Sequence, residues 1–81
     1  MVAQSTPRID LERARQHVAE AERRIAAQRE LVERMVRDHD PEAAVETART
    51  LLRTFEETLV AMRRHLEQEV SSVKAENERG R

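Results

Sequence analysis

The sequence predicts an all-α protein of two long antiparallel helices, a helical hairpin or antiparallel coiled coil, that dimerises into a four-helix bundle. Three observations support this fold class. Apolar residues recur at alternating steps of three and four in each half of the chain, and the two series mirror each other about Asp40. The composition is that of long helices, since charged residues make up 38% of the 81 residues, aromatic residues 1%, and there is one glycine.

Each half of the chain carries one heptad series, and each series is apolar except at one position. The series are Leu11, Ala14, Val18, Ala21, Ile25, Gln28, Val32 and Met35, and then Val45, Ala48, Leu52, Phe55, Leu59, Met62, Leu66 and Glu69. Each residue of the first series pairs with the residue of the second whose number brings the sum to 80, so that Met35 faces Val45. Such pairing requires two helices folded back on each other. Gln28 interrupts the first series. It either fixes the register as a buried polar group or lies at the boundary, where its amide reaches water.

The first helix is expected over about residues 7–38, after a flexible N-terminus at residues 1–5. Thr6 followed by Pro7 is a good helix start. The threonine hydroxyl can accept hydrogen bonds from free backbone amides, and the missing N–H of proline costs nothing at the first helical position.

A tight turn is expected at residues 38–41. Pro41 disfavours helical geometry at Asp40, and Asp40 is itself a strong N-cap with Pro41 at the first helical position. The second helix is expected over about residues 41–73, followed by a charged tail at 74–81. Residues 6–73 therefore form a single helical-hairpin domain.

The two flanks of the predicted hairpin differ. On one flank Leu31 opposes Leu51, whereas on the other like charges stand opposite and opposite charges lie diagonally. In a two-helix hairpin these leucines would be partly exposed to water. The seam and the leucines together form a wide apolar stripe, which suits a bundle of more than two helices. We therefore expect a homodimer, with a monomeric hairpin as the alternative. The expected oligomer-interface residues are Ile25, Gln28, Leu31, Leu51, Phe55 and Thr58.

His17 and His65 are the sharpest candidates for chemistry. The mirror register places both on the same flank, with Glu69 one turn beyond His65, and such a set could bind zinc. An exposed histidine on a helical hairpin also resembles the phosphoacceptor domain of sensor kinases. Neither the Glu-x-x-His motif of di-iron bundles nor a proline shortly after either histidine is present. We expect boundary histidines, with a pH-responsive contact as the alternative, and no catalytic, cofactor-binding or metal-binding residues.

Other function classes find little support. The chain has no glycine-rich phosphate loop and no nucleophile motif, so we do not expect an enzyme. A net charge of −1 gives no general attraction to nucleic acid or membrane, and no run approaches the ~18 apolar residues of a membrane span. Nucleic-acid binding through Arg23, Arg24, Arg63 and Arg64 is the alternative function, and a histidine phosphotransfer or metal-binding helical bundle is the third. The lack of cysteine and of a signal peptide favours the cytoplasm.

Two stretches resemble a known group of proteins. They are His17-Val-Ala-Glu-Ala-Glu-Arg-Arg-Ile-Ala-Ala-Gln-Arg29 and Leu51-Leu-Arg-Thr-Phe-Glu-Glu-Thr-Leu59. They are similar to short, uncharacterised bacterial proteins with an H-V/I-A-E-x-E-R-R-I/V-x-x-Q-R half and an L-L-x-T-F-E-x-T-L half, over roughly residues 15–66. In that group a glycine often ends the first helix, where this chain has Arg37-Asp38-His39-Asp40-Pro41. The resemblance implies a natural small protein and brings no activity or site residues.

These observations together predict a small non-enzymatic helical protein with an interaction or structural role. It would self-associate through its coiled-coil-like apolar face. The expected partner is a second copy of the chain, and a heterologous helical protein is the alternative partner.

Overall fold

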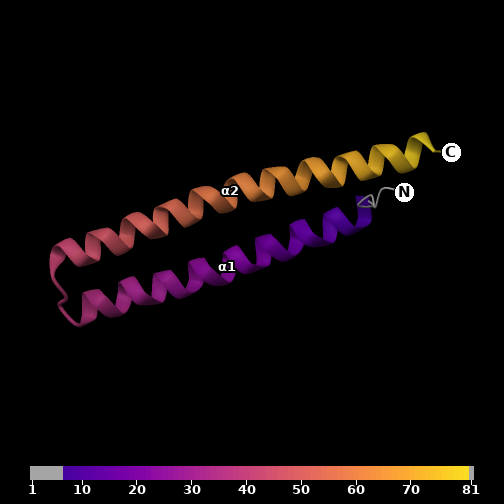
Figure 1. The fold of residues 1–81 in the computed structure, drawn as a ribbon. Helices are drawn as coiled ribbons and strands as arrows, with labels where there is room; N and C mark the ends of the chain where they lie inside the picture. Colours follow the sequence, from indigo (N-terminus) through magenta and orange to yellow (C-terminus); the bar gives the residue numbers. More distant parts are fainter. Residues whose placement is uncertain (1–6, 81) are drawn as a thin grey trace, which may run out of the picture.

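The computed structural model describes residues 7–80 and shows two antiparallel helices joined by a short turn (Figure 1). Helix α1 spans Pro7–Arg37 and helix α2 spans Glu42–Arg79, which confirms the predicted hairpin. The molecule measures 61 × 25 × 15 Å. Its Cα radius of gyration is 18.3 Å, against about 12 Å for a compact domain of this length. The predicted flexible residues 1–5 and the Thr6 cap lie outside the described residues.

The two predicted heptad series form the core between the helices. All sixteen positions are buried or half-buried, as the mirror register requires. Ile25 is the most buried, at 4% exposure, and Val45, Ala48, Leu59 and Val32 follow. No side chain in the described part is less than 2% exposed, so the core is a single thin seam.

Gln28 ties the two helices together at mid-seam. Its side-chain Nε2 donates a hydrogen bond to the backbone oxygen of Ala48, 2.9 Å away, and the pair is partly buried. The side chain is half-buried, between the two environments expected for it. A polar group satisfied across the seam favours this register over one shifted along the helix, because a shift would break the bond.

The end of α1 is closed by a Schellman motif. The backbone N–H of Asp40 donates to the oxygen of Met35 at 3.0 Å, and that of His39 donates to the oxygen of Val36 at 3.1 Å. His39 takes the left-handed conformation, with φ 58°, where a glycine is usual. This conformation costs a non-glycine residue about 1 kcal/mol. The missing glycine therefore leaves the turn geometry intact.

Asp40 is not the N-cap of α2, contrary to prediction. Pro41 holds that position in an extended conformation, with φ −53° and ψ 139°, and α2 begins at Glu42. The oxygen of Pro41 accepts hydrogen bonds from the N–H groups of Ala44 and Val45, and no side chain caps the helix. The reason is that Asp40 already belongs to the motif that closes α1.

Helix α2 continues past Val73, where the sequence pattern had suggested a charged tail. Val73 is half-buried and extends the seam by one more position. Beyond it the chain is helical to Arg79, and the N–H of Gly80 donates to the oxygen of Glu76 at 3.0 Å. Lysine, alanine and glutamate are good helix formers, so helical propensity persists there although the apolar periodicity fades.

Candidate interaction surface

The two long edges of the hairpin differ in chemistry. One edge carries two ion pairs between the helices, Arg29 with Glu56 at 2.9 Å and Arg63 with Glu22 at 2.7 Å. These are the diagonal pairs of opposite charge that the register predicts. Each partner is more than 40% exposed, so each pair contributes at most about 1 kcal/mol. We call this side, defined by these four residues, the ionic edge.

The other side of the hairpin carries a row of uncharged residues on α2. They recur at alternating steps of three and four, and all are exposed. We call the following set the neutral row: Ala44, Thr47, Leu51, Thr54, Thr58, Ala61, His65 and Gln68. Residues at this spacing lie along one face of α2, beside the seam that packs against α1.

Helix α1 adds mixed residues beside the neutral row. Leu31 is half-buried on this flank, while Arg13, Glu20 and Arg24 carry charges. The guanidinium carbon of Arg24 lies 6.0 Å from the centroid of the Phe55 ring, within reach of a cation–π interaction. The uncharged part of this flank therefore belongs to α2, and α1 forms its charged rim.

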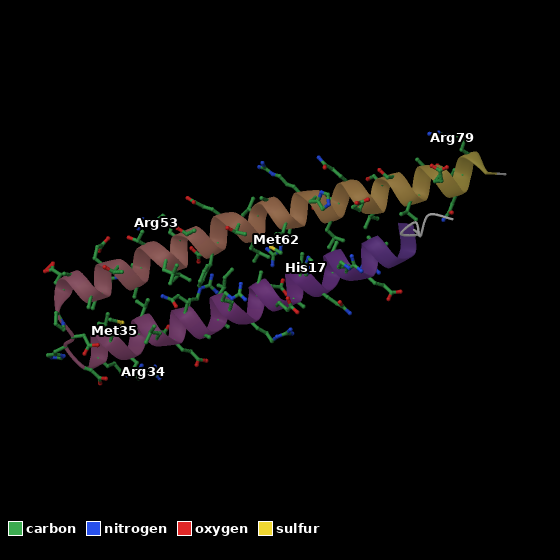
Figure 2. The ribbon with its side chains drawn as sticks, viewed as in Figure 1. His17, Arg34, Met35, Arg53, Met62 and Arg79 are labelled. Atoms are coloured by element: carbon green, nitrogen blue, oxygen red, sulfur yellow. The ribbon has the colours of Figure 1, made fainter. Side chains whose placement is uncertain are left out.

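A groove of about 470 Å³ opens on this flank toward the end away from the turn. Its lining comprises Arg13, Ala14, His17, Thr58, Ala61, Met62, His65 and Glu69. A smaller hollow of about 190 Å³ continues it toward Phe55 and shares His17, Thr58 and Met62. Figure 2 shows His17 on α1 and Met62 on α2 lying near each other between the helices.

The two histidines line this same groove, as the register predicts. The Nε2 atom of His65 lies 3.6 Å from a carboxylate oxygen of Glu69, one helical turn along α2. Within residues 7–80, however, no three histidine or acidic side chains are arranged to hold a metal ion. The geometry thus offers a polar end to an apolar groove, without a third ligand for zinc.

The predicted interface residues divide into two groups. Leu51, 45% exposed, and Thr58 lie in the neutral row, and half-buried Leu31, Gln28 and Phe55 lie close by. Ile25 is buried within the seam and has little surface left for a second chain. Six members of the row are not among the predicted interface residues, although a charge map of α2 alone would have revealed them. These are Ala44, Thr47, Thr54, Ala61, His65 and Gln68.

The arginines considered for nucleic-acid binding do not form one free patch. Arg63 is paired with Glu22, and Arg24 lies over Phe55. Half of the set is therefore engaged within the hairpin, and glutamates surround the rest in the sequence. This arrangement gives phosphate groups no concentrated positive surface.

Compared with protein-family models, with curated proteins and with solved structures, the chain matches none of them. Neither of the helices described over residues 7–80 is both apolar enough and long enough to cross a membrane. The features that bear on function are therefore the geometry and charge of the two sides of the hairpin.

Proposed function

We propose that this protein is a small, non-enzymatic helical protein with an interaction or structural role that self-associates through the neutral row and the adjoining Leu31 and Phe55. The observation that carries the proposal is the neutral row itself. Eight exposed residues at heptad spacing, without a charge among them, are unusual on a chain in which 38% of residues are charged. Helix-to-helix docking is the use for which such spacing is suited.

The thin core supports this proposal. The accessible surface is 6684 Å², whereas a compact 9.4 kDa monomer exposes about 5,000 Å². Among residues 11–80, only five hydrophobic residues are buried between the helices. Chains of this size commonly gain stability by oligomerisation, because one small core contributes few kcal/mol.

Two-fold symmetry strengthens the argument for a second copy. Covering the exposed 45% of Leu51 contributes about 1 kcal/mol, and a symmetric dimer gains this twice. The threonine and alanine members of the row add methyl groups without a charge to desolvate. A heterologous helix with a similar uncharged seam is the alternative partner.

The proposal places the protein in the cytoplasm. The chain has no cysteine and would use no disulfide, which suits a reducing compartment. Tagging the protein at either end and locating it in fractionated cells tests this part separately.

Light scattering across a dilution series, with helicity recorded by circular dichroism on the same samples, tests the proposal. We expect a molar mass of twice the 9.4 kDa of one chain at the higher concentrations, falling toward 9.4 kDa on dilution. A fully helical species of 9.4 kDa at every concentration up to the millimolar range would overturn self-association.

A further inference from the structure

The flank that carries the neutral row differs in surface shape between its two ends. Toward the turn, Leu51 is 45% exposed and is the one large aliphatic side chain of the row, with half-buried Leu31 on the same flank. Toward the open end, the 470 Å³ groove hollows the same flank. An exposed leucine and a groove on one surface are the two halves of a self-complementary contact.

Four lining residues of the groove have the geometry that receives such a side chain. Thr58, Ala61, Met62 and His65 stand at positions i, i+3, i+4 and i+7 of α2. Four residues at this spacing form the hole of knobs-into-holes packing. Helix α1 contributes Arg13, Ala14 and His17 to the lining, and a volume of about 470 Å³ stays open between them and α2.

We propose that Leu51 of one copy inserts into the hole formed by Thr58, Ala61, Met62 and His65 of a second copy, and reciprocally. The proposal rests on the proposed function and specifies its arrangement. The two α2 helices lie antiparallel, related by a two-fold axis that crosses them at the level of residue 56. Residues whose numbers sum to about 112 then meet, so Thr47 faces His65 of the second copy.

This arrangement keeps the contact uncharged. In it Thr54 faces Thr58 of the second copy, and Ala44 faces Gln68, so that every facing pair comes from the neutral row. It also sets large against small side chains, as the intramolecular seam does at Ala14 and Leu66. Two charged residues, Arg13 of α1 and Glu69 of α2, also line the groove but take no part in these facing pairs.

The available area suits a dimer of moderate affinity. The row from Ala44 to Gln68 is about 36 Å long at 1.5 Å per residue. A strip about 20 Å wide, one helix and the adjoining flank of α1, then covers about 700 Å² per copy. Standard interfaces bury about 800 Å² per partner, so we expect dissociation near the micromolar range.

Cross-linking of mixed single-cysteine variants tests the arrangement, because the chain has no cysteine of its own. Thr47→Cys and His65→Cys are exposed substitutions; His65 is one of the four hole residues, and Leu51, the other three hole residues and the seam stay unchanged. Mixed and treated with a short bis-maleimide, the two variants should give at least tenfold more covalent dimer than either variant alone. In the proposed dimer, identical cysteines lie about 27 Å apart along the helices and cannot be bridged.

The matched control replaces His65→Cys by Glu67→Cys, which is equally exposed but lies outside the row. Mixed with Thr47→Cys, it should cross-link only at background level. Circular dichroism of each variant checks that the hairpin is retained.

Three results would overturn the arrangement without touching self-association. Covalent dimer from Thr47→Cys alone would mean parallel α2 helices. Cross-linking of Arg34→Cys with Thr47→Cys would mean that the two-fold axis runs parallel to the helices, so that α1 of one copy packs on α2 of the other. A doubled mass by light scattering with no cross-link from any pair would place the interface elsewhere. A mass of 9.4 kDa throughout would instead reject the proposed function.

Discussion

The ionic edge and the neutral row are two sides of the same seam, and the hairpin leaves them in different states. On the ionic edge, Arg29 and Arg63 find their carboxylate partners on the other helix of the same chain. On the neutral row nothing comparable closes the surface, and eight uncharged residues face solvent. One side is thus satisfied by the fold itself, whereas in our proposal the other is covered by a second copy of the chain.

Exposure of a single apolar side chain does not distinguish the two sides. Val60 is 49% exposed, slightly more than Leu51 at 45%. Yet Val60 lines a hollow of about 310 Å³ whose lining also includes Arg29, Glu56 and Arg63. A partner docked there would have to desolvate these charges, which is costly unless each is paired again. The neighbours of an apolar residue therefore decide whether it marks an interface.

The largest expected effect comes from the seam that both sides share. Ile25→Ala removes the most buried side chain and leaves a cavity, which should lower the free energy of unfolding by about 3 kcal/mol. Urea unfolding followed by circular dichroism measures this. The control is Val36→Ala, 48% exposed, which should change stability by less than about 0.5 kcal/mol. Equal effects of the two substitutions would contradict the assigned core.

The smallest expected effect belongs to the ionic edge. A double-mutant cycle on Arg29→Ala and Glu56→Ala should give a coupling of about 0.5 kcal/mol, because both side chains are largely solvated. The coupling should fall further at high salt. A coupling above about 2 kcal/mol would show that this edge contributes as much to stability as a buried contact and would reverse the comparison.

Heptad arithmetic predicted the seam because a buried face repeats in the sequence whenever two helices pack along their length. Ile25 and Val45 are buried as expected, and the diagonal pairing of Arg29 with Glu56 follows from the same register. The ends of the helices were harder to predict from the sequence. Asp40 has the side chain of an N-cap, but it belongs to the motif that closes α1, and the extended Pro41 takes the N-cap position of α2; a local propensity does not show this.

The candidate surface was predicted only in part, for a different reason. Leu51 and Thr58 were found because they oppose residues of α1 across the seam. Thr47 and Ala61 oppose nothing in the hairpin, so a comparison of facing positions passes over them. The groove next to Ala61 depends on the sizes of side chains from both helices, and only the packed structure shows it.

A matched pair of charge substitutions tests the central claim, that the neutral row and not the ionic edge is the interface. Leu51→Glu and Val60→Glu place the same carboxylate at similarly exposed sites on the two sides. By light scattering at a concentration where the wild-type chain is dimeric, Leu51→Glu should have the 9.4 kDa mass of one chain and unchanged helicity, and Val60→Glu should stay dimeric. Retention of the dimer by Leu51→Glu, or its loss in Val60→Glu alone, would contradict the assignment.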